Sequence, residues 1–459
     1  MLALTAVAFG LAWWLGLYLV ARDPGKPVLR RAAYGLISYS LAVACHGLAA
    51  AAPAEARTAL TALATVLVHL SGVAWAGVLL RLAPETADWR DRLDLWWRRA
   101  AAPLTVAVLV GAALMAAFGG PAGWTALASL LVVAQLATGF GVLLWSRRAT
   151  RPAPVVGVLA AATLLFGLGL SGLLLPLGWL PDWLAVAGIG ADLAILGLVV
   201  AVLDAFSEGE TLRPDMWRSA ITATAAATLF GGQIGFAMLI SGGVSPLLAA
   251  LLLGSVAAAI GVQVLANPLH RALDRLSLAS SGLRAERAQL RDVSDALPRR
   301  DPGSRLADMD AEEFGRLTRR ALSHYGDLGR LVTSPLTDLP LIEHRLARRD
   351  AAGQTALSPV ERATELKALL LESITRLKPP DGEVGFSDEW RHYNALYFPY
   401  VLGLRPYSQR ARHAGLDATA RQALRWFQTH VPERTLHNWQ NAAAKLVADD
   451  LWARSRQDA

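Results

Sequence analysis

Hydrophobic positions in the first 266 residues form long runs, whereas beyond them apolar residues recur at helical spacing among charges. A helix needs about 20 apolar residues to cross ~30 Å of hydrocarbon. Nine segments approach this length: 2–21, 32–53, 58–80, 102–119, 123–146, 153–180, 183–206, 219–241 and 246–266. Beyond them no run has a convincing strand pattern. The pattern predicts an all-α protein: a polytopic membrane bundle over 1–266, a helical connector over 267–300 and a helical domain over 301–459.

Charge is distributed in the same two-part way. Of 459 residues, 18% are charged, but the share is about 10% in residues 1–266 and about 28% in residues 267–459. This contrast excludes a single globular domain. The single cysteine, Cys45, excludes a disulfide framework and a cysteine-based zinc site. No basic residues precede segment 2–21, so we expect it to be a retained membrane helix and not a cleaved signal peptide.

The basic residues between the spans predict the orientation. Fourteen lie in alternate loops: Arg22, Lys26, Arg30, Arg31, Arg81, Arg90, Arg92, Arg98, Arg99, Arg147, Arg148, Arg151, Arg213 and Arg218. The remaining loops carry only Arg57. Because Lys and Arg resist translocation, the N-terminus is predicted outside, and nine spans place the C-terminal domain in the cytoplasm.

Polar residues within the predicted spans are candidates for function, because they are costly in lipid. Five are expected in the outer half of the bilayer as a ligand site: His46, His69, Gln135, Asp192 and Gln233. One hypothesis is an outward-opening pocket with Asp192 as its anionic anchor. Another is hydrogen bonding between neighbouring helices. A haem or metal held by His46 and His69 is a third alternative, although we predict no metal and no cofactor.

The connector carries leucine at every seventh position: Leu269, Leu276, Leu283, Leu290 and Leu297. A seven-residue apolar repeat on a charged helix is typical of a coiled-coil seam. The sequence therefore predicts a parallel homodimer through a signalling helix over 267–300. The alternative is an amphipathic helix lying on the membrane or on its own domain.

Beyond the connector, helices are expected over 311–331, 359–378, 387–402, 417–430 and 433–452. The glycine-rich phosphate loops of a kinase domain are missing, and no catalytic set of side chains stands out. We therefore predict that the chain is not an enzyme.

The end of the chain, 417–452, has a helix-turn-helix-like pattern around VPERTLHNW. Val431 and Leu436 are expected to be buried. Candidate DNA-contacting residues are Arg434, Thr435, His437, Asn438 and Gln440, whose types suit phosphate and base-edge contacts. His430 replaces the glycine that is usual at the turn, so a plain α-hairpin that binds protein is an equal alternative.

These motifs carry two loose resemblances. The bundle and its exit, NPLHRALDRL, resemble the multi-span N-terminal sensor region of bacterial 7TM-type histidine kinases, but the kinase core is missing. The segments from SPLTDLP to PERTLHNWQNAAAKL are similar to helical modules that end in a sigma-like helix-turn-helix in bacterial regulators. The resemblances imply a bacterial inner-membrane receptor for an unknown small-molecule or membrane signal, acting as a membrane-bound transcription regulator. The alternatives are a membrane-anchored adaptor with a protein partner and, less favoured, a transporter or membrane enzyme.

Overall fold

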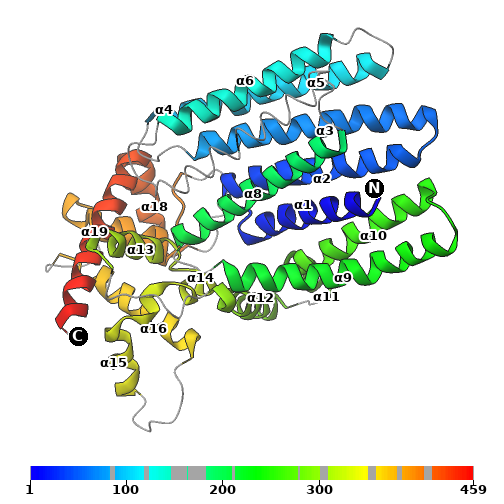
Figure 1. Cartoon of the computed structure of the whole chain (residues 1–459). Coiled ribbons are helices and arrows are strands. Elements are labelled where there is room, and N and C mark those ends of the chain that lie inside the picture. The colour runs from blue at the N-terminus through cyan, green and yellow to red at the C-terminus, as the bar shows by residue number, and fades with distance from the viewer. Residues whose placement is uncertain are drawn as a thin grey trace. The chain divides into compact units, whose positions relative to one another are not determined.

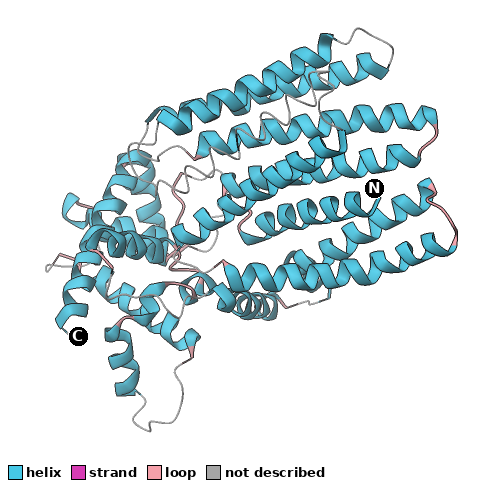
Figure 2. Cartoon of the chain, in the orientation of Figure 1, coloured by secondary structure: helices cyan, strands magenta, loops and turns pink. Residues whose placement is uncertain are grey.

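The chain folds into helices throughout the part described by the computed structural model (Figure 2). Described residues are 2–82, 88–117, 123–145, 163, 182–208, 212–277, 280–299, 309–349, 358–379, 385–407 and 416–457. The all-α prediction is confirmed for these residues. The predicted span 153–180 lies outside them, apart from Thr163.

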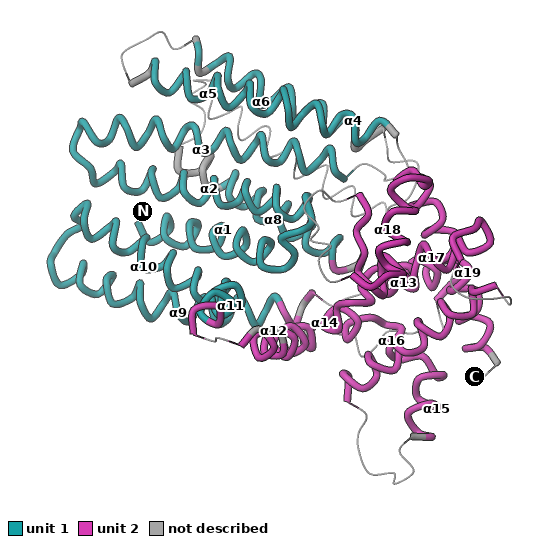
Figure 3. Tube along the Cα trace, turned by 180° about the vertical axis from the view of Figure 1, so that it is seen from behind, with its two compact units in different colours: residues 1–204, 216–273 teal, residues 205–215, 274–459 magenta. Residues whose placement is uncertain are grey.

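Two compact units make up the structure (Figure 3): residues 1–204 with 216–273, and residues 205–215 with 274–459. The helices of the first unit, some of which extend into the second, are shown in Figure 1. They are α1 (Leu2–Arg22), α2 (Pro27–Ala51), α3 (Ala54–Arg81), α4 (Asp88–Trp96), the π-helical turn η1 (Trp97–Ala101), α5 (Ala102–Ala117), α6 (Gly123–Trp145), α8 (Asp182–Glu208), α9 (Arg213–Ile240), α10 (Pro246–Val264) and α11 (Ala266–Ser277). Seven helical stretches in the described residues are long and apolar enough to cross a membrane.

Small residues allow these helices to approach closely. In the first unit α2 packs against both α1 and α3, and α3 packs against α6. At Gly190 in α8, an added Cβ would lie 2.6 Å from the hydroxyl oxygen of Tyr39 in α2, so only glycine fits beside this buried ring. Helices in lipid associate through such close packing, since lipid provides no hydrophobic driving force between them.

The second unit has a helical core of its own. Its elements are α12 (Ser281–Ala296), η3 (Leu297–Arg299), α13 (Ala311–Ser323), α14 (Leu328–Val332), η5 (Pro335–Asp338), α15 (Pro340–Arg349), α16 (Pro359–Thr375), η6 (Asp388–Trp390), α17 (Arg391–Leu396), η7 (Tyr397–Val401), α18 (Ala418–His430) and α19 (Glu433–Gln457). Buried leucines of α13, α14 and α16 share one core with the buried face of α19, which α13 and α16 contact directly. Ser358 and Glu361 form a capping box at the start of α16, and Pro359 occupies the first helical position between them.

The predicted helix over 311–331 is two helices in the structure. α13 ends before His324, and the side chain of Asp327 accepts a hydrogen bond from the amide of Arg330 (3.1 Å), which caps a new helix. Apolar spacing continues across the break, which is why the periodicity alone did not reveal it. The predicted helices over 417–430 and 433–452 are confirmed by α18 and α19.

The connector differs most from its prediction. Ser280 has extended backbone, and its hydroxyl caps α12, so α11 and α12 are separate helices. Asp274 forms ion pairs with Arg287 (3.1 Å) and Arg291 (2.5 Å). In one continuous helix, thirteen residues would separate Asp274 from Arg287 by about 20 Å. The chain therefore folds back, and the prediction of an unbroken coiled-coil helix over 267–300 is wrong for this structure.

Candidate functional site

His69 has hydrogen-bond partners on both of its ring nitrogens. Its Nδ1 lies 2.6 Å from the backbone oxygen of Thr65, and its Nε2 lies 3.0 Å from the hydroxyl of Ser129 in α6. A backbone oxygen can only accept, so Nδ1 carries the proton and Nε2 accepts from Ser129. The ring is buried, with 2% of its surface exposed. These contacts fit the hypothesis of hydrogen bonding between helices and leave no ring nitrogen for a metal or haem.

The other predicted intramembrane ligand residues do not converge on His69. The side chain of Gln135 bonds with Trp97 and Thr105, Asp192 is half-buried, and His46 and Gln233 are exposed on the bundle. No hydrogen bond joins any two of these five described residues. Among the residues with described side chains, no group of three His, Cys, Asp or Glu could hold a metal ion. The structure therefore does not bring the five together as one pocket.

A buried carboxylate that the sequence pattern does not reveal lies at the centre of a polar network in the described bundle. The side chain of Asp94 in α4 has 0% of its surface exposed and forms ion pairs with three arginines. The distances are 2.6 Å to Arg31 in α2, 2.6 Å to Arg81 in α3 and 3.1 Å to Arg98 in η1, four residues further along the chain. A buried carboxylate is tolerated only when it is paired in this way. Asp94 thus joins three segments of the chain.

The network continues from Arg31 into the bundle. The guanidinium of Arg31 donates to the backbone oxygen of Gly77 (2.6 Å) and lies 4.6 Å from the ring centre of Trp97. The indole nitrogen of Trp97 donates to Gln135 (3.0 Å), whose amide donates in turn to Thr105 (2.5 Å). Trp97 belongs to the π-helical turn η1, a local widening of the helix that is frequent at functional sites. Five helical segments are thereby connected through polar groups.

A second cluster joins further helix ends. Asp204, near the end of α8, forms an ion pair with Arg22 at the end of α1 (3.0 Å) and another with Lys26 just before α2. In the sequence, Arg22, Lys26, Arg31 and Arg81 are recognisable only as loop charges that set the orientation. The structure shows that they are also paired across helices. Their acidic partners lie on other helices, 13 residues away for Arg81 and 182 for Arg22, so helical spacing could not reveal them.

In the second unit, the α18–α19 corner is built around a small apolar core. Val431 and Leu436 are buried, as predicted, and lie in one core with Phe427. Trp426 stacks on Trp439 with ring centres 5.9 Å apart. The hydroxyl of Tyr407 donates to the backbone oxygen of Val431 (2.5 Å), at the end of α18. The turn between the helices is therefore fixed from both sides.

The candidate DNA-contacting residues fall into two groups. Arg434, His437 and Asn438 are exposed on the first turns of α19, as expected, and Thr435 is half-buried. The prediction for Gln440 is wrong: it is 8% exposed, and its amide donates to the backbone oxygen of Ala395 (3.3 Å). Gln440 follows Leu436 by one turn, so it lies on the buried face of the helix.

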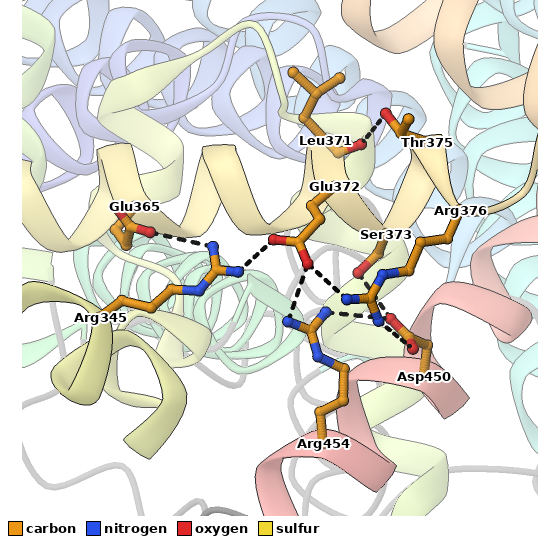
Figure 4. A network of polar contacts seen from close by, with 9 residues as sticks. All are labelled: Arg345, Glu365, Leu371, Glu372, Ser373, Thr375, Arg376, Asp450 and Arg454. Carbon is orange, nitrogen blue, oxygen red and sulfur yellow. Dashed lines mark hydrogen bonds and ion pairs between the residues drawn. The ribbon is translucent and has the colours of Figure 1, made fainter. Parts of the chain in front are cut away.

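An ion-pair network fixes the far half of α19 (Figure 4). Glu372 in α16 pairs with Arg345 of α15, with Arg376 (2.7 Å) and with Arg454 of α19 (3.3 Å). Asp450 of α19 pairs with Arg376 (3.2 Å). Burial raises the pKa of Glu372, but the hydrogen bond and charge of Arg345 and the charges of Arg454 and Arg376 lower this pKa overall. The network and the apolar core together hold α19 in place, so its first turns are presented on a rigid element.

No family model, no curated protein and no solved structure matches the chain.

Proposed function

We propose that this chain is a multi-pass membrane receptor of a bacterial inner membrane that passes a signal to a cytoplasmic helical domain, and that this domain contacts DNA. Seven apolar helices support membrane embedding. With α6 and the segment 153–180 included, the number of spans in this proposal is nine.

The arrangement of helix ends supports the N-outside, C-inside orientation. The ion pairs of Asp94 and Asp204 join the ends of α1, α3 and α8 to the beginning of α2 and to the first part of the continuous helix formed by α4, η1 and α5. Successive helices therefore run in opposite directions, with their basic ends together at one side of the bundle. The basic side of a bundle faces the cytoplasm, so the chain leaves the membrane on that side. The unbroken coiled coil is not part of this proposal, because the connector folds back at Ser280.

The exposed face at the start of α19 is the observation that carries the output function. Arg434, His437 and Asn438 project from its first turns, while Val431 and Leu436 hold the turn in the core. A recognition helix presents such residues to the major groove from its N-terminal end. A guanidinium suits phosphate or guanine, and an asparagine amide can pair with adenine.

DNA binding is tested with the full chain in lipid nanodiscs and a random duplex pool, at ~50 mM salt where electrostatic binding is strongest. Recovered sequences are then measured by fluorescence anisotropy. Asn438→Ala should reduce the preference for one base pair by about 1–3 kcal/mol. Arg434→Ala should instead weaken binding to every sequence if Arg434 contacts phosphate. The matched control is Arg348→Ala, which removes an exposed arginine from α15.

A membrane-anchored adaptor is the second candidate. Gln440 points inward, so fewer of the predicted side chains are available for contacts with bases. The aromatic core around Trp426 and Trp439 would stabilise a protein-binding hairpin as well as a DNA-binding one. If no duplex binds under the conditions above, the regulator proposal fails and the adaptor replaces it.

A further inference from the structure

The helix α11 exposes its apolar face and buries an acidic residue of its polar face. Leu269, Leu273 and Leu276 follow one another at three- and four-residue spacing and are exposed, Leu276 to 87%. Asp274 is only 8% exposed, because Arg287 and Arg291 cover its carboxylate. A water-facing helix normally shows the opposite arrangement. The leucine face is therefore left without a cover by the residues that the structure describes.

The position of α11 in the chain indicates what covers it. α10, one of the helices able to cross a membrane, ends at Val264, and α11 begins at Ala266. Leu265 between them has φ −95° and ψ 20°, which interrupts the helix, so α11 is a separate segment (Figure 3). At 1.5 Å per residue, Leu276 is within about 20 Å of the end of α10 even if the chain extends as a helix. The leucines are thus within reach of the bilayer surface.

The charges of α11 fit the same surface. Arg271 and Arg275 are exposed, and the only acidic residue of the helix, Asp274, is neutralised by two arginines. A helix with leucine on one face and arginine on the other lies in the headgroup layer, where anionic lipids attract its basic side chains.

We propose that α11 is an interfacial anchor that lies in the surface of the bilayer, with Leu269, Leu273 and Leu276 in the acyl boundary and its arginines among anionic headgroups. A lipid surface fits better than a second copy of the chain. A leucine seam over the whole connector needs one continuous helix, and the chain folds back between Asp274 and Arg287. The anchor joins the last apolar helix to α12, whose Val293 packs in the core of the second unit. In this proposal, the lipid composition of the bilayer acts on the output domain through α11 and α12.

The test places single cysteines in a Cys45→Ala background of the full chain, labels them with bimane and reconstitutes the protein in nanodiscs. Labels at Leu276 and at Arg271, on the opposite face of α11, are compared using lipids that carry a nitroxide just below the headgroup. We expect quenching to be several-fold stronger at Leu276 than at Arg271, and iodide in the water to give the reverse order. Replacing phosphatidylcholine with phosphatidylglycerol should increase lipid quenching at Leu276.

The inference rests on the proposed membrane embedding. A label at Leu251, an exposed position of α10, therefore tests the embedding separately from the anchor. Lipid quenching at Leu251 but equal quenching at Leu276 and Arg271 would overturn the anchor and leave the embedding intact. Failure at Leu251 would overturn both. Efficient disulfide crosslinking between copies through an unlabelled Leu276→Cys, together with weak lipid quenching, would show that a second copy covers this face. Equal quenching in both lipids would overturn the role of anionic headgroups.

Discussion

Gly77 in α3 is the position where the smallest change should disturb the Asp94 network most. A Cβ added there would lie 2.7 Å from Cζ2 and 2.9 Å from Cζ3 of Trp97, with Cη2 closer still. Carbon atoms pack best at about 3.5–4.0 Å, so Gly77→Ala requires the indole to move. Moving the ring would disrupt its hydrogen bond to Gln135 and its contact with the guanidinium of Arg31.

The expected loss of stability follows from two contributions. Overfilling a packed site costs about 1–3 kcal/mol, and losing the hydrogen bond between Trp97 and Gln135 adds about 1 kcal/mol. The sum is about 2–4 kcal/mol. At about 2–4 °C per kcal/mol, the midpoint of thermal unfolding should fall by roughly 4–16 °C.

The assay is size-exclusion chromatography of the detergent-solubilised full chain after heating, with Gly111→Ala as the matched control. Gly111 is also a helical glycine, in α5, but a Cβ there meets nothing within 4 Å. This control should leave the midpoint unchanged or raise it, because alanine favours helix. A Trp97→Phe background removes the far ring atoms, so Gly77→Ala should cost less there. Equal losses for Gly77→Ala and Gly111→Ala, or for Gly77→Ala in both backgrounds, would refute the steric reasoning.

Three further predictions concern topology, pH dependence and the output domain. Reporter fusions after Ala54 and after Arg299 should give periplasmic and cytoplasmic signals respectively, and either signal reversed contradicts the orientation derived from the basic residues. Glu372→Gln should lower stability at neutral pH by about 1 kcal/mol or less, since the partly exposed carboxylate is screened. Because the pKa of Glu372 is lowered in the folded chain, its contribution is present above the ordinary carboxylate pKa and is lost as pH falls through the folded value. Wild type and variant should therefore converge in chemical denaturation at acid pH, and a constant difference would contradict the ion-pair origin. Leu436→Ala should destabilise the α18–α19 corner by about 2–5 kcal/mol in hydrogen exchange, whereas unchanged protection would show that Leu436 is not part of the core; exposed Asn438→Ala is its control.

The sequence by itself determined the helical class, the apolar bundle and the polar helical domain. Long apolar runs and helical periodicity are local signals, and they placed α18 and α19 to within a few residues. The burial of Val431 and Leu436 followed from the same periodicity. Periodicity also predicted a seam of five leucines, but it could not detect that the chain folds back at Ser280 and brings Asp274 to the arginines of α12.

Only the tertiary structure decided which polar groups meet. Asp94 is one acidic residue among many in the sequence, and its burial beside Arg31 and Arg81 arises from the packing of α2, α3 and α4, which local spacing does not reveal. The same packing pairs His69 with Ser129 and turns Gln440 inward. A hydropathy pattern fixes which face of a helix is apolar, but the rotation and depth of one helix against another depend on side-chain fit across the interface. For that reason the sequence predicted the elements, whereas the polar networks that join them depended on the assembled fold.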